Sequence, residues 1–68
     1  MSVTSKILTK EELAQHLDKY FTEHFGSKDS VEWFEATAVN VWYFKKNGKF
    51  YALKSHILTG EVEEHVEG

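Results

Sequence analysis

Residues 39–53 read VNVWYFKKNGKFYAL and predict a β-hairpin. Two runs rich in β-branched and aromatic side chains flank Asn47-Gly48, the dipeptide that most readily adopts the positive φ angles of a type I′ turn. A loop of this length sets the pairing of the two strands, so that Trp42 should lie opposite Leu53. The sequence therefore predicts the register of the hairpin as well as its strands.

Both faces of this hairpin are apolar, because successive side chains of a strand alternate between the two sides of the sheet. The inner face carries Trp42, Phe44, Tyr51 and Leu53, and the outer face carries Val39, Val41, Tyr43, Phe50 and Ala52. A chain of 68 residues is too short to cover both faces with its remaining residues. We expect one face to be covered by the chain itself and the other to contact a partner.

An amphipathic helix is predicted ahead of the hairpin. Thr9 and Glu12 have the spacing of a capping box, in which each side chain accepts a hydrogen bond from the other residue's backbone amide. Apolar side chains then recur at helical spacing at Leu13, Leu17, Tyr20, Phe21 and Phe25. Gly26 is placed to end the helix. The apolar stripe of this helix is the expected cover for the inner face.

The chain between the helix and the hairpin is β-like from residue 31 onwards, and a break or bulge within residues 35–38 is expected to divide it into two strands. Strand character continues after the hairpin to Leu58. Residues 61–68 contain four Glu, so a frayed acidic tail is favoured over a short edge segment through Val62 and Val66.

These elements predict a single α+β domain over residues 1–68, with residues 1–8 as a lead-in. The expected architecture has two layers, in which one N-terminal helix packs on a three-stranded antiparallel sheet.

The composition narrows the classes of function. The chain has no Cys and no Arg, and its eight Lys are outnumbered by eleven Asp and Glu, which gives a net charge of −3. The absence of Cys excludes disulfide scaffolds and Cys-based zinc sites, and it favours a cytoplasmic location. An acidic balance repels nucleic acid, and no apolar run approaches the length of a membrane span. We therefore expect a cytoplasmic protein with no membrane partner.

No catalytic, cofactor-binding or metal-binding pattern can be identified. The four His residues, His16, His24, His56 and His65, do not share a chelating spacing. His24 falls within the apolar arc of the helix near its C-terminal end, where a part-buried imidazole is expected rather than a metal ligand. We therefore predict that the protein is not an enzyme and needs no cofactor or metal.

The prediction of function is based on the outer face of the hairpin. Its candidate interface residues are Val39, Val41, Tyr43 and Phe50, since exposed aromatic side chains are enriched at protein interfaces. We expect a homodimeric protein–protein interaction module, an accessory regulator or inhibitor whose protein partner the sequence does not identify. The alternative is binding of single-stranded nucleic acid, with the aromatic residues as a stacking platform and Lys45, Lys46 and Lys49 as candidate phosphate contacts.

Overall fold

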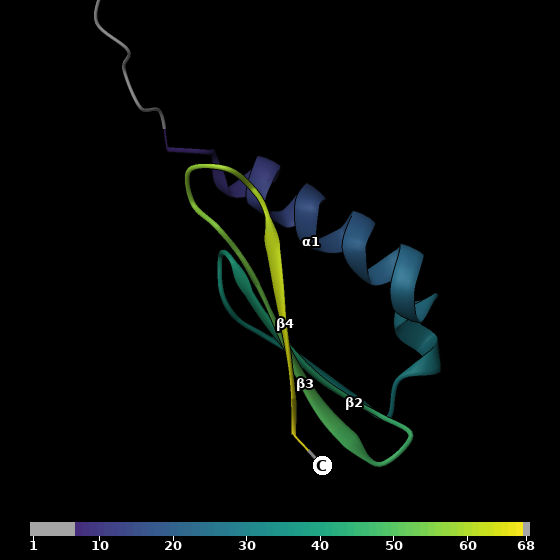
Figure 1. Ribbon diagram of the computed structural model, residues 1–68. Coiled ribbons are helices and arrows are strands. Elements are labelled where there is room, and N and C mark those ends of the chain that lie inside the picture. The colour runs from purple at the N-terminus through teal and green to yellow at the C-terminus, as the bar shows by residue number, and fades with distance from the viewer. Residues whose placement is uncertain (1–6, 68) are drawn as a thin grey trace, which may run out of the picture.

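The computed structural model describes residues 7–67, which form a helix packed on a four-stranded sheet (Figure 1). The elements are α1 (Lys10–Phe25), the short 3-10 helix η1 (Lys28–Ser30), β1 (Trp33–Ala38), β2 (Val41–Lys46), β3 (Lys49–Ser55) and β4 (Val62–Glu67). The strands are antiparallel and lie in the order β1-β2-β3-β4, with α1 across one face. The predicted two-layer α+β architecture is confirmed, with one strand more than expected.

Both ends of α1 follow from its capping residues. The Thr9 hydroxyl accepts a hydrogen bond from the Glu12 amide at 3.1 Å, and the Glu12 carboxylate accepts one from the Thr9 amide at 2.9 Å. The predicted capping box is therefore present. At the other end, Gly26 has a φ of 86°, in the region that glycine adopts without strain. The helix buries Leu13, Leu17 and Phe21 towards the sheet.

The β2–β3 hairpin has the predicted turn and register. Asn47 and Gly48 both have positive φ, at 54° and 79°, as a type I′ turn requires. Trp42 pairs with Leu53, and every other pair of the hairpin also matches the predicted alignment. Consequently the inner face points towards α1, and no helix among residues 7–67 covers the outer face (Figure 1).

The core lies between α1 and the inner face. Its buried residues are Leu17, Phe21, Trp42, Phe44 and Leu53. The Phe21 ring packs edge-on against the Phe44 ring, with centroids 4.9 Å apart. Burial of each such side chain stabilises the fold by about 1.5–3 kcal/mol, so these contacts hold the helix on the sheet.

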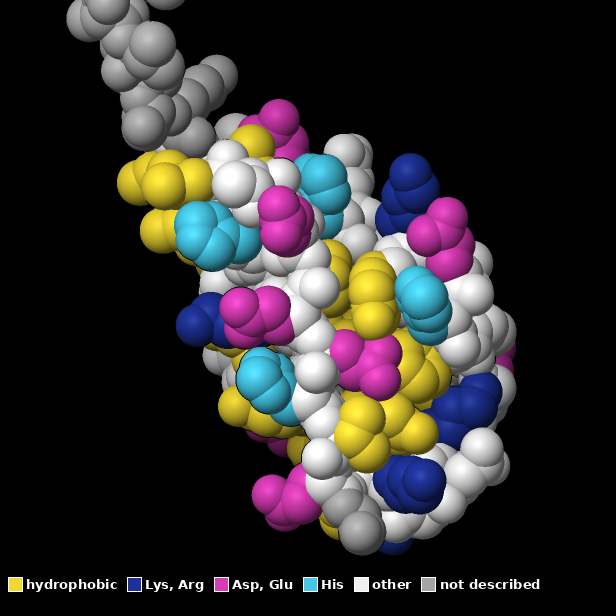
Figure 2. Space-filling model, in the orientation of Figure 1, with side chains coloured by type: hydrophobic (Ala, Val, Ile, Leu, Met, Phe, Trp, Pro, Cys, Tyr) yellow, Lys and Arg dark blue, Asp and Glu magenta, His cyan; other side chains and the backbone are white. Residues whose placement is uncertain are grey.

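The sheet has a fourth strand, and the prediction of three strands with a frayed tail is wrong for residues 62–67. β4 pairs with β3 along its whole length, from Val62 opposite Ser55 to Glu67 opposite Phe50. Val62 packs against the core, and the Glu64 carboxylate accepts a hydrogen bond from the Tyr20 hydroxyl at 2.7 Å. β4 lies at the edge nearest the viewer in Figure 2, where acidic and hydrophobic side chains alternate. Pairing with β3 thus organises a segment of low intrinsic β-propensity.

The connections on either side of the hairpin differ in how well they were predicted. The register of β1 and β2 shifts between Ala36 and Ala38, which confirms the predicted bulge, but the two strands are divided by the turn at residues 39–40, just beyond it. β3 ends at Ser55 instead of continuing to Leu58. Residues 56–61 form a loop, because the Gly60 amide donates to the His56 carbonyl at 2.8 Å and the His56 amide donates to the Glu61 carbonyl at 2.7 Å.

Candidate protein-binding interface

The outer face is built from all four strands, whose pairing sets its side chains in three rows that cross the sheet. The first row contains Trp33, Lys45, Phe50 and Glu67. The middle row contains Glu35, Tyr43, Ala52 and His65. The third row contains Ala38, Val41, Lys54 and Glu63.

Three aromatic side chains of the outer face are exposed and lie close together. The exposed fractions are 42% for Trp33, 40% for Tyr43 and 48% for Phe50. The rings of Trp33 and Phe50 meet edge-on with centroids 6.2 Å apart. Ala52 lies beside them, and the small side chain leaves a shallow hollow lined by all three aromatic residues. Large exposed rings around a hollow are typical of a surface that buries a partner's side chain.

The structure brings together three of the four predicted interface residues. Val41, Tyr43 and Phe50 lie on the outer face, with Val41 half-buried. Val39 lies in the turn between β1 and β2 and is 54% exposed, so it borders the outer face without belonging to a strand. Trp33 also lies on the outer face, although it was not among the predicted interface residues. Its place on the outer face depends on the pairing of Trp33 with Lys45, which the sequence did not specify.

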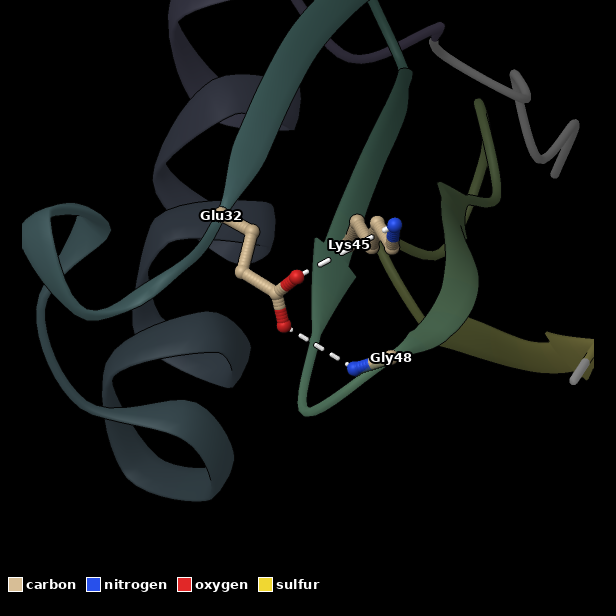
Figure 3. A network of polar contacts seen from close by, with 3 residues as sticks. All are labelled: Glu32, Lys45 and Gly48. Carbon is tan, nitrogen blue, oxygen red and sulfur yellow. Dashed lines mark hydrogen bonds and ion pairs between the residues drawn. The ribbon is translucent and has the colours of Figure 1, made fainter.

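A polar contact fastens the start of β1 to the tip of the hairpin (Figure 3). One carboxylate oxygen of Glu32 accepts a hydrogen bond from the Gly48 amide at 2.9 Å, and the other lies 3.9 Å from the Lys45 ammonium. The same ammonium lies 5.3 Å from the centre of the Phe50 ring. An exposed ion pair adds less than about 1 kcal/mol to stability. Its effect here is to hold Lys45 beside the aromatic residues of the first row.

The three lysines considered for phosphate contact do not form one surface. Lys46 donates to the Phe25 carbonyl at 2.7 Å and to the Ser30 hydroxyl at 3.1 Å, so its ammonium lies against the end of α1. Lys49 pairs with Lys46 and shares its side of the sheet. Of these three lysines, only Lys45 lies on the outer face. The strand pairing places two lysines on that face, Lys45 and Lys54, against three glutamates, Glu35, Glu63 and Glu67.

The histidines make separate contacts and do not lie against one another. His24 is exposed, which corrects the prediction of a part-buried ring. Tyr20 occupies the position against the core, and the His24 ring stacks on it from outside with centroids 4.1 Å apart. His56 accepts a hydrogen bond from the Leu58 amide at 3.2 Å, and His65 lies 3.5 Å from Glu63. Within residues 7–67, no three acidic or imidazole side chains are grouped to hold a metal ion.

The only long helix among the described residues is α1, and it is too short and too polar to cross a membrane. Comparisons with protein-family models, with curated proteins and with solved structures found no significant match to this chain.

Proposed function

We propose that the protein is a non-catalytic protein–protein interaction module that forms a homodimer through the outer face of its sheet. The observation that carries this proposal is the exposure of Trp33, Tyr43 and Phe50 side by side on that face. In this proposal the dimer serves as an accessory regulator or inhibitor, which acts by occupying a surface of another protein.

The asymmetry between the two sides of the sheet supports this proposal. α1 covers the inner face and buries Phe44 and Leu53 completely, whereas the outer face has no covering element among the described residues. Domains of this size bury only about 60% of the surface that the unfolded chain exposes, and association is a common remedy. A second copy that covers Tyr43 and Phe50 would complete a second apolar layer.

The size of the outer face predicts a weak dimer. Four strands spaced about 4.8 Å apart and about six residues long present roughly 400 Å² per protomer. The total is below the ~1,200 Å² at which stable specific interfaces begin, although aromatic anchors concentrate the binding energy. We therefore expect a dissociation constant of about 1–100 μM rather than a nanomolar one.

Light scattering across a concentration series tests the proposal. The mass of the native protein should rise from monomer towards dimer between about 1 μM and about 1 mM. Tyr43→Lys and Phe50→Lys should each weaken association at least tenfold, because each places an uncompensated charge in the contact. Circular dichroism should show that α1 is retained in both variants.

Leu58→Lys is the matched control for these substitutions. Leu58 is 44% exposed, close to the values for Tyr43 and Phe50, but it lies in the loop between β3 and β4. It should leave the mass unchanged. A native protein that stays monomeric over the whole series, or an effect of Leu58→Lys equal to that of Phe50→Lys, would refute the proposal.

The binding of single-stranded nucleic acid remains the second candidate, because exposed aromatic rings on a sheet face can stack on bases. The arrangement of charges disfavours it, since Lys46 is bonded to α1 and glutamates outnumber lysines on the outer face. Any affinity for labelled single-stranded RNA or DNA should collapse between about 50 and 200 mM salt. Sub-micromolar binding that persists at the higher salt and is lost in Phe50→Ala would replace the dimer with a nucleic-acid platform.

A further inference from the structure

We propose that the two copies pair about a two-fold axis parallel to the strands, so that Tyr43 of each copy packs over the partner's Ala52. This inference rests on the proposed homodimer and specifies its geometry. It follows from the order of side chains in the three rows of the outer face, which the strand pairing determines.

Two arrangements are open to a pair of sheets that pack face to face with nearly aligned strands. An axis parallel to the strands keeps each row in place and reverses the strand order, so β1 lies over the partner's β4. An axis perpendicular to the strands keeps the strand order and exchanges the first row with the third, so β1 lies over the partner's β1. The side chains that meet are different in the two cases.

The perpendicular axis brings like groups together. It places Glu35 over the partner's Glu35 and Glu63 over the partner's Glu67, which are like-charged pairs in a contact that excludes water. It also places Tyr43 over the partner's Tyr43 and Ala52 over the partner's Ala52. Two bulky rings therefore meet at one point of the middle row and two methyl groups at the next, so the middle rows do not fit together.

The parallel axis brings unlike groups together. Tyr43 lies over the partner's Ala52, at the shallow hollow of the outer face. In the middle row Glu35 lies over the partner's His65, whose imidazole can donate a hydrogen bond to a carboxylate. In the first row Lys45 lies over the partner's Phe50, a cation next to an aromatic face. No row sets two charges of the same sign against each other, and in the middle row the large Tyr43 side chain meets the small Ala52.

Chemical cross-linking distinguishes the two axes, because the chain has no native Cys. Glu35 and His65 are both exposed and can be replaced by Cys singly or together. A bismaleimide whose reach matches the ~10 Å between packed sheets should join residue 35 to the partner's residue 65 in the double variant. Neither Glu35→Cys nor His65→Cys alone should yield a dimer, because identical residues lie roughly 17 Å apart about the parallel axis.

The control pairs Glu35→Cys with Gln15→Cys, an exposed position on the side of α1 away from the core, and should give no cross-linked dimer. Cross-linking of Glu35→Cys alone would overturn the parallel axis in favour of the perpendicular one. A protein that is dimeric by light scattering but is not cross-linked in the double variant would also overturn this geometry while leaving the proposed function intact. If light scattering shows only a monomer, both the proposed homodimer and its two-fold geometry are refuted.

Discussion

Of the glycines Gly26, Gly48 and Gly60, only Gly60 lacks room for a side chain. It has a φ of 79°, and a Cβ atom at this position would lie 2.5 Å from the Nε2 atom of His16. Gly60 is buried in the loop that leads into β4, while His16 belongs to α1. The missing side chain therefore lets the β3–β4 loop close against the helix.

Gly60→Ala should lower the free energy of unfolding by about 1–2 kcal/mol, because backbone strain is joined by the smaller cost of turning the exposed His16 ring away. Gly48→Ala is the matched control, because Gly48 also has a φ of 79° but has open space where its Cβ would lie. It should cost about 1 kcal/mol, from strain alone. Chemical denaturation of both variants checks this difference. In a His16→Ala background the excess cost of Gly60→Ala should disappear, and its persistence there would contradict the explanation.

Tyr20 links α1 to β4 through a contact that depends on pH. The Tyr20 hydroxyl donates to the Glu64 carboxylate at 2.7 Å, and this hydrogen bond, with burial and the nearby negative charge, raises the pKa of Tyr20 above its usual value of 10.0. A folded-state pKa above the unfolded one favours the folded state as long as Tyr20 keeps its proton. This stabilisation is complete below pH 10 and is lost as the pH rises through the folded-state pKa.

Tyr20→Phe should therefore reduce stability by about 1 kcal/mol or less at neutral pH and remove this alkaline component. Denaturation curves of the native protein and the variant, measured from pH 7 to beyond pH 10, should converge at the alkaline end. Glu64→Gln keeps an acceptor without the charge, so it should bring the pKa of Tyr20 back towards the usual value. Parallel curves for the native protein and Tyr20→Phe over the whole range would exclude the proposed linkage.

At the scale of the elements, the stability of α1 depends on the capping box formed by Thr9 and Glu12. Thr9→Ala removes the acceptor for the Glu12 amide and should cost about 1 kcal/mol of unfolding free energy. Thr22→Ala serves as the comparison, because Thr22 is exposed on the same helix and Ala has the higher helix propensity. Urea denaturation should show a loss in the first variant only. Equal stability of the two variants would mean that the capping box contributes nothing.

The elements that the sequence predicted correctly are those set by local chemistry. The capping box and Gly26 define α1 within one segment, and Asn47-Gly48 aligns β2 with β3 without reference to the rest of the chain. The residues of the core could be predicted from these two elements, because the apolar stripe of α1 was the only helical surface predicted to cover the inner face.

The elements that were missed depend on contacts between distant segments. β4 contains three Glu, follows a fourth at Glu61 and has little β-propensity of its own. Its order comes from pairing with β3 and from the Tyr20–Glu64 hydrogen bond. Trp33 reaches the outer face through the alignment of β1 with β2, which depends on where the register shifts. Six of the twelve side chains in the three rows depend on these two features, namely the β1 residues Trp33, Glu35 and Ala38 and the β4 residues Glu63, His65 and Glu67. The sequence therefore predicted which side chains β2 and β3 place on the outer face, but not which ones β1 and β4 place there.

At the scale of the whole molecule, the outer face is expected to be buried when the protein associates. Collisional quenching of Trp33 fluorescence by acrylamide measures this burial, because Trp33 is 42% exposed on that face while Trp42 is 7% exposed in the core. A Trp42→Phe variant makes Trp33 the sole reporter. The quenching constant should fall as the concentration rises from about 1 μM to about 1 mM, in step with the mass, and Phe50→Lys in the same background should abolish the fall. A quenching constant that stays unchanged while the mass doubles would show that the dimer forms elsewhere and would contradict the account.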